Sequence, residues 1–99
     1  MKVFISQPMN GLPDDLVLHE RMKIIYRLHI DPIDVINSFI KEVPEGAGRI
    51  WCLGDSIRLM DQADLVVFHK DWKKARGCRI EHDVCMAYKI PYVEMEEEQ

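Results

Sequence analysis

The hydrophobic positions of the chain alternate between short continuous runs and longer stretches with helical spacing. Four runs rich in β-forming residues predict strands, because short apolar runs bounded by turn residues are typical of buried strands. These runs are Val3–Ile5, Val35–Phe39, Leu65–Phe68 and Pro91–Val93. The third run is continuously apolar rather than alternating, which indicates a central parallel strand covered on both faces.

The first of three predicted helices has clear signals at both ends. Pro13 followed by Asp14 and Asp15 marks its start, because proline and acidic residues are favoured in a first turn. Asp31-Pro32 marks its end. One arc of its helical wheel is apolar, and we expect this arc to pack against a sheet. The arc consists of Val17, Leu18, Met22, Ile24, Ile25 and Leu28.

The remaining segments complete an alternating pattern of strands and helices. Helices are predicted over Leu53–Ala63 and from Arg76 or Gly77 to Lys89, and residues 43–48 are predicted to form a loop. The order β-α-β-α-β-α-β indicates a parallel sheet with right-handed crossovers and helices on both faces. We therefore expect an α/β fold, a flavodoxin-like three-layer sandwich with a four-stranded parallel sheet in the order 2-1-3-4.

This topology predicts where a ligand would bind. The first and third strands lie side by side at the switch point, and ligands bind beyond the carboxyl ends of such strands. Two loops meet there, residues 6–11 and residues 69–77. The first loop offers hydroxyl and amide groups that suit a sugar, although a plain tight turn would have the same composition. Its candidate binding residues are Ser6, Gln7, Pro8, Met9, Asn10 and Gly11.

One carboxylate on the third predicted helix is a candidate for chemistry. Glu81 falls within the apolar arc of the helical wheel, about one turn from the helix start and at the end nearest the crevice. An ionised carboxylate is costly there unless it is paired, hydrogen-bonded or kept protonated, and beside a bound ligand a raised pKa or nucleophilic use becomes possible. The alternative is a structural residue that pairs with Arg76, Arg79 or a helix amide, or tilts toward solvent. The arc also holds Cys78, Ile80, Val84, Cys85, Ala87 and Tyr88.

Basic residues gather at the start of the same helix. Because a helix N-terminus attracts anions and nearby cations strengthen the attraction, the cluster favours a phosphate on the ligand. A solvated loop is the alternative. Trp72 in this loop is a candidate for stacking on a base, or it covers apolar surface; Arg76 and Gly77 are candidate binding residues. The cluster consists of Lys70, Lys73, Lys74, Arg76 and Arg79.

Composition and charge fit one small domain. The 99 residues are 47% hydrophobic and 30% charged, which is typical of a single globular core. The net charge of −4 arises in residues 94–99, which hold four acids, while the rest carries as many acids as bases. This balance argues against a nucleic-acid partner. We expect a domain over residues 1–93 and an acidic tail over residues 94–99.

The sequence lacks the patterns of membrane-spanning, secreted, disulfide-rich and metal-binding proteins. No apolar run approaches the roughly 18 residues of a membrane helix, and the N-terminus lacks the apolar core of a signal peptide. The three cysteines Cys52, Cys78 and Cys85 are odd in number and show no CxxC spacing, and the histidines show no metal-binding spacing. We therefore expect reduced thiols in a cytoplasmic protein with no metal, no cofactor and no membrane partner.

Three segments together resemble a known family. They are residues 3–13 (VFISQPMNGLP), residues 63–68 (ADLVVF), and Trp72 with residues 75–82 (ARGCRIEH). In this combination the sequence resembles the nucleoside 2-deoxyribosyltransferase-like superfamily, above all its small bacterial and phage members. The resemblance extends from Lys2 to about Val93.

The resemblance implies a flavodoxin-like fold and chemistry at the N-glycosidic bond of a nucleoside or nucleoside 5′-monophosphate, by hydrolysis or deoxyribosyl transfer. In the characterised enzymes a helix-borne glutamate four residues after a glycine attacks the anomeric carbon, and Glu81 after Gly77 matches it. Ser6 matches a position that contacts the sugar or a 5′-phosphate. The resemblance also implies a small-molecule nucleoside or nucleotide partner and a homo-oligomer.

The sequence departs from the family pattern in two ways. The enzymes carry an orienting aspartate before the third strand. By spacing, eight residues before Asp64, that position is Ser56 here, and Asp55 is one residue off. The chain is also shorter than the characterised transferases, which build parts of their sites from extra segments or a neighbouring subunit.

Three functions therefore remain open. The first is an enzyme with Glu81 as its nucleophile. The second is a module that binds a nucleotide or nucleotide derivative without turnover, which the serine at position 56 favours. The third is an interaction domain, for which Met86 on the third predicted helix is a candidate exposed contact.

Overall fold

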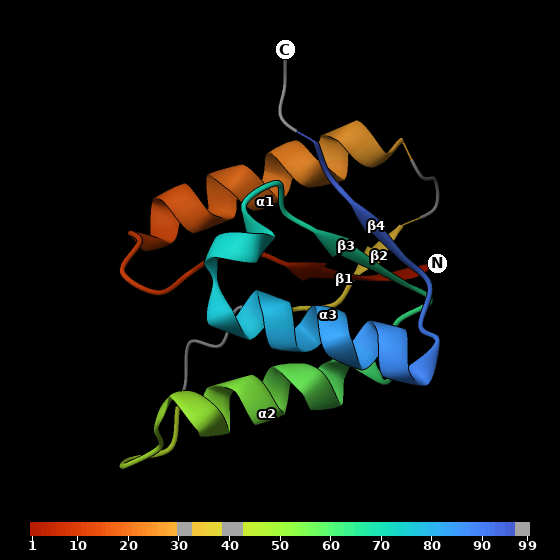
Figure 1. Cartoon of the computed structure of the whole chain (residues 1–99). Coiled ribbons are helices and arrows are strands. Elements are labelled where there is room, and N and C mark those ends of the chain that lie inside the picture. The colour runs from red at the N-terminus through yellow and green to blue at the C-terminus, as the bar shows by residue number, and fades with distance from the viewer. Residues whose placement is uncertain (30–32, 39–42, 97–99) are drawn as a thin grey trace.

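The computed structural model of the chain describes residues 1–29, 33–38 and 43–96 (Figure 1). Its four strands form one parallel sheet in the order β2-β1-β3-β4. The strands are β1 (Lys2–Ser6), β2 (Asp34–Val35), β3 (Leu65–Phe68) and β4 (Tyr92–Glu94). The helices are α1 (Asp14–Leu28), α2 (Arg49–Met60), α3 (Arg76–Tyr88) and the short 3-10 helix η1 (Trp72–Lys74).

The helices cover both faces of the sheet, with α1 on one face and α2 and α3 on the other (Figure 1). The chain therefore forms an α/β sandwich of the flavodoxin-like kind, and the predicted strand order is confirmed. The parallel pairing of β1 with β3 brings the carboxyl ends of these two strands side by side.

The alternation of side chains along β1 divides the core into two parts. Val3 and Ile5 pack with Ile24 of α1, whereas Phe4 packs with Phe68 and with Met60 of α2. Successive side chains of a strand point to opposite faces, so Ser6 continues the face of Phe4. The last residue of β1 therefore presents its hydroxyl to the α2 and α3 side of the sheet.

Two predicted elements have different bounds in the structure. The second strand is confined to Asp34–Val35 instead of Val35–Phe39, because the chain leaves the sheet after Ile36 donates to the Val3 carbonyl. Phe39 lies outside the described residues. The second helix begins at Arg49 and ends at Met60, rather than spanning Leu53–Ala63. Its first turn is exposed, so no apolar stripe in the sequence marks it.

The buried face of α1 differs from the predicted apolar arc. Val17, Arg21 and Ile24 are buried, whereas Leu18 and Met22 of the predicted arc are exposed. The buried residues follow the i, i+4, i+7 spacing of one helix face. The buried face of α1 is therefore centred near Arg21, a polar residue. The predicted arc, which was drawn from apolar residues alone, is rotated from this face toward Met22.

The buried face of α3 is also rotated relative to its predicted arc. Cys78, Glu81 and Cys85 are buried as expected, together with His82, but Tyr88 is exposed. The position of Glu81 on the buried face is thus confirmed. Met86 is exposed, as the sequence predicts.

The described part of the predicted acidic tail lies against the sheet. Glu94 is the last residue of β4, and the Met95 amide donates to the Phe68 carbonyl at 2.8 Å. The Arg27 guanidinium donates to the Glu96 carbonyl at 3.3 Å. The last strand therefore ends one residue later than predicted. No helix in the described part of the chain is long and apolar enough to cross a membrane.

The face of α1 provides a test of the fold. Ile24→Ala removes a buried side chain and is expected to lower the free energy of unfolding by about 2–5 kcal/mol. Met22→Ala changes a side chain that is 63% exposed and is expected to change it by less than about 0.5 kcal/mol. Urea denaturation measures both values. Equal losses in the two variants would contradict the orientation of α1.

Candidate functional site

The carboxyl ends of β1 and β3 bring the two predicted loops together. Ser6 pairs in register with Phe68, and the His69 amide donates to the Ser6 carbonyl at 2.8 Å. Residues 6–11 and 69–77 therefore leave the sheet side by side. Gln7, which follows Ser6, contacts α1 instead of α3. The side chains of Ser6 and Gln7 thus make contacts on opposite faces of the sheet.

On the α3 side, the Ser6 hydroxyl donates a hydrogen bond to Glu81 Oε1 at 2.7 Å. Both side chains are buried, with exposed fractions of 1% for Ser6 and 7% for Glu81. Among the described residues this is the hydrogen bond that Glu81 receives, and no cation pairs with it. The structure thus joins two residues that are 75 positions apart in sequence and that the family resemblance marks separately.

Burial changes the protonation of this carboxyl. Desolvation raises the pKa of Glu81 to about 7, and the hydrogen bond from Ser6 opposes this rise because it favours the charged form. Burial, with a smaller contribution from the charge of Glu81, also raises the pKa of Cys78 and Cys85 to about 11. The thiols are therefore protonated near neutral pH, and Glu81 is the group here that exchanges a proton in that range.

The helix places Glu81 one turn from its start. Gly77 lies in the first turn of α3, and Ala75 precedes the helix without a side-chain cap. The first-turn amides of α3 therefore lack the capping oxygen that a serine or aspartate would supply. The predicted alternative partners of Glu81 lie elsewhere: Arg76 is exposed, and Arg79 donates to the Lys73 carbonyl at 2.9 Å.

The basic cluster is partly engaged in local contacts. Lys74 pairs with Asp71 at 3.4 Å, and Lys73 Nζ lies 5.6 Å from the centre of the Trp72 ring. That ring stacks on His82, with ring centres 4.1 Å apart and planes 7° from parallel. These contacts favour the interpretation that Trp72 covers apolar surface. Arg76 and Lys70 remain exposed on the two sides of the loop.

The two aspartates that bear on the spacing of the missing aspartate, Asp55 and Asp64, have partners of their own. Asp55 pairs with Arg58 at 2.6 Å on the same helix. Asp64 accepts from the backbone N–H of Lys2 at 2.8 Å, at the amino end of the sheet. Ser56 is half-buried in α2. The Asp55 carboxylate is therefore engaged within α2, and no group of described residues is arranged to hold a metal ion.

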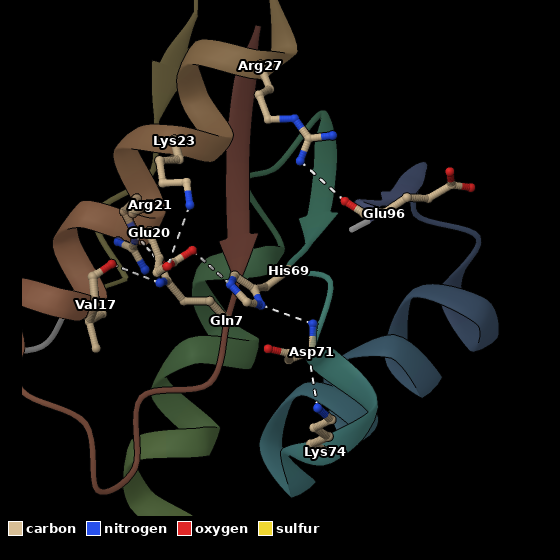
Figure 2. A network of polar contacts seen from close by, with 10 residues as sticks. All are labelled: Gln7, Val17, Glu20, Arg21, Lys23, Arg27, His69, Asp71, Lys74 and Glu96. Atoms are coloured by element: carbon tan, nitrogen blue, oxygen red, sulfur yellow. Dashed lines mark hydrogen bonds and ion pairs between the residues drawn. The ribbon is translucent and has the colours of Figure 1, made fainter. Parts of the chain in front are cut away.

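On the α1 side, a buried polar network holds the first loop in place (Figure 2). Arg21 donates to Gln7 Oε1 at 2.7 Å. Arg21 also donates to Ser38 Oγ at 3.0 Å. Gln7 in turn donates to the Val17 carbonyl at 2.9 Å. Burial lowers the pKa of Arg21. The sequence analysis did not identify Arg21, although its spacing from Val17 and Ile24 places it on the same helix face.

The remaining predicted loop residues differ in where they lie. Gln7 and Pro8 line a cavity of about 250 Å³ between the loops that follow β1 and β3. Met9 accepts a hydrogen bond from the Leu12 amide in a turn, and Asn10 is exposed. Gly11 has a φ of +80°, a left-handed conformation that favours glycine. The first two of these residues thus line the cavity, and the rest of the loop forms a tight turn.

A family model matches residues 1–94 of the chain, so the chain belongs to that family, which is described as a domain of unknown function (DUF4406). No curated protein and no solved structure matches the chain.

The raised pKa of Glu81 makes folding stability depend on pH. Below its ordinary pKa of 4.5 the carboxyl is protonated in both states, and its stabilising effect is complete. As pH rises through about 7, the folded state must ionise a buried group, and that effect is lost. We expect the unfolding free energy of the wild type to fall by about 3 kcal/mol relative to Glu81→Gln between pH 4 and pH 8.

Urea denaturation across this pH range measures the difference. Asp83→Asn, which removes an exposed carboxylate from the same helix, is the control for the loss of one charge. Parallel stability curves for the wild type and Glu81→Gln would contradict the burial of an ionisable Glu81.

Proposed function

We propose that this DUF4406 protein cleaves the N-glycosidic bond of a 2′-deoxyribonucleoside or its 5′-monophosphate, with Glu81 as the nucleophile. The observation that carries the proposal is the hydrogen bond between the buried Glu81 carboxyl and Ser6, at the carboxyl ends of β1 and β3. Ligands of parallel α/β sheets bind at this edge. The resemblance to nucleoside 2-deoxyribosyltransferases marks the same two residues.

The proposed reaction proceeds in two displacements. The Glu81 carboxylate forms a bond to C1′ while the C1′–N bond breaks, and the base leaves with that electron pair and takes a proton from solvent. Water then attacks C1′, loses a proton and restores the carboxylate, which releases the sugar. A second base in place of water would give deoxyribosyl transfer. Covalent catalysis by a carboxylate splits one difficult displacement into two easier ones.

The surroundings of Glu81 support this role. With a pKa of about 7, a substantial fraction of the carboxyl is ionised at neutral pH and free to attack. The Ser6 hydroxyl fixes one carboxylate oxygen and favours the charged form. Buried surroundings with few competing hydrogen bonds leave the carboxylate weakly solvated, which increases its reactivity toward a developing positive charge.

The start of α3 supports a 5′-phosphate on the substrate. Its first-turn amides have no side-chain cap, and Arg76 stands exposed beside them. A helix N-terminus with a free cation favours an anion. Because Glu81 lies one turn further along α3, a phosphate at this end would lie near the sugar that Glu81 attacks.

A module that binds a nucleotide without turnover is the second candidate. The observation in its favour is the engagement of Asp55 with Arg58, which leaves Ser56 at the position of the orienting aspartate. An enzyme without that aspartate lacks one group that places the nucleophile. The homo-oligomer that the resemblance implies stays a prediction, and a neighbouring copy is the expected source of further site residues.

Release of free base tests the proposed activity. Wild-type protein is incubated with a panel of deoxynucleosides and their 5′-monophosphates, and free base is measured by chromatography. We expect release from at least one substrate, and a fall of more than about 1,000-fold in Glu81→Gln, because the nucleophile is lost. Asp83→Asn, on the exposed face of the same helix, is expected to retain the wild-type rate.

The same panel separates the two candidate functions. If calorimetry detects binding of a nucleotide and the nucleotide is then recovered intact, the protein is a binding module and the proposed enzyme activity is wrong. Unchanged release in Glu81→Gln would remove Glu81 from the chemistry.

The pH dependence of the rate tests the role of Ser6. Because the attacking form is the carboxylate, we expect kcat/KM to rise with pH to a plateau, with a midpoint near pH 7. Ser6→Ala removes the hydrogen bond that lowers the pKa of Glu81, so the midpoint moves to higher pH and the rate at pH 6 falls by about tenfold.

Ser38→Ala is the matched control, because Ser38 is also buried but bonds to Arg21 on the α1 side. Its midpoint is expected to stay at the wild-type value. A midpoint that does not move in Ser6→Ala would show that the hydroxyl leaves the protonation of the nucleophile unaffected.

A further inference from the structure

The cavity between the two loops is lined by both apolar and polar residues. Its volume is about 250 Å³, and it lies between α1 and the residues that follow β1 and β3. The apolar lining residues are Pro8, Leu12, Leu16 and Val17. The polar lining residues are Gln7, Glu20, His69, Lys70 and Asp71. Apolar lining combined with a few polar groups is typical of a small-ligand site.

Hydrogen bonds join three of the polar lining residues, Asp71, His69 and Glu20 (Figure 2). The Asp71 amide donates to His69 Nδ1 at 3.0 Å, so this ring nitrogen is an acceptor and the proton lies on Nε2. His69 Nε2 therefore donates to Glu20 Oε2, 3.3 Å away. His69 is buried and both of its ring nitrogens are in use. His69 thus holds one oxygen of the Glu20 side chain in place.

Glu20 keeps an accepting oxygen available to a ligand. In the described part of the chain, its Oε1 forms only a long ion pair with Lys23, at 3.8 Å, and its side chain is 28% exposed. Lys70, which also lines the cavity, is an exposed donor. The polar lining thus combines a carboxylate acceptor with a cationic donor.

We propose that this cavity holds the leaving base and that Glu20 selects bases that carry an exocyclic amino group. The inference rests on the proposed function for the identity of the ligand as a nucleoside. An exocyclic N–H donates to the Glu20 carboxylate, whereas a carbonyl at the same place would set one negative oxygen against another. Lys70 donates to a ring nitrogen or carbonyl elsewhere on the base.

The placement agrees with the geometry of displacement. Ser6 directs its side chain to Glu81 on the α3 side, whereas Gln7, whose side chain bonds to Val17 and Arg21 of α1, lines the cavity on the α1 side. A sugar that lies across the ends of β1 and β3 would therefore have the nucleophile on one side and the base on the other. A nucleophile must approach C1′ from the side opposite to the leaving group, so this placement is compatible with the displacement.

Equilibrium binding to Glu81→Gln protein tests the inference, because this variant is expected to bind substrate without cleaving it. Two matched pairs serve as probes: deoxyguanosine with deoxyinosine, which differ only in one amino group, and deoxycytidine with deoxyuridine. We expect the amino member of at least one pair to bind at least about tenfold tighter, as for a hydrogen bond to a charged group. Adding Glu20→Gln is expected to reduce this preference to less than about threefold.

Two further variants locate the effect. Asp15→Asn, on the exposed first turn of α1, is the charge control and is expected to keep the preference. Leu16→Trp narrows the cavity from a partly exposed position and is expected to weaken both members of a pair alike.

Three results would overturn the inference: a preference that survives Glu20→Gln, tighter binding of the members without the amino group, or no binding of any of the four nucleosides. Failure of the proposed function is distinguishable from these. A preference that depends on Glu20, without base release by the wild type, would remove the activity and keep the cavity. If base release depends on Glu81 but the preference does not depend on Glu20, the proposed activity stands and the role of Glu20 in the cavity is removed.

Discussion

The hydrogen bond between Ser6 and the buried carboxyl of Glu81 is the interaction on which the functional account depends. It exists because the parallel pairing of β1 with β3 ends at Ser6, and because α3 turns its Cys78, Glu81 and Cys85 face toward that end of the sheet. A carboxyl in this position is costly to ionise, and an apolar residue of similar size would make a more stable core. Natural proteins retain such costly groups mainly at functional sites.

The alternation of side chains at one strand end gives the site its two sides. Ser6 donates a hydrogen bond to Glu81 on the α3 side of the sheet. Gln7 accepts a hydrogen bond from Arg21 and lines the cavity on the α1 side. The backbone bond from His69 to Ser6 keeps both loops at a fixed distance from each other. A shift of one residue in the register of β1 would exchange the two faces, so the register of the sheet and the chemistry of the site are specified together.

The sequence was sufficient for the parallel sheet, its order and the burial of Glu81, because these follow from continuous apolar runs and from local helical spacing. The sequence was insufficient to predict burial where a polar residue is buried because its hydrogen-bond partners come from distant parts of the chain. Arg21 occupies the core-facing side of α1 because Gln7 and Ser38 accept its hydrogens, and a wheel that counts only apolar residues therefore shifted the buried face toward Met22. The pairing of Glu20 with His69 joins residues 49 positions apart and leaves no local signal.

The central claim is that the buried Glu81 forms a bond to the sugar, and trapping that bond tests it most directly. Wild-type protein is mixed with a cleavable deoxynucleoside, quenched in acid and analysed by mass spectrometry of the intact chain and of its peptides. The account predicts a mass increase of one deoxyribosyl group, located on Glu81. Rapid base release with no adduct on the protein, or an adduct on another residue, would contradict it.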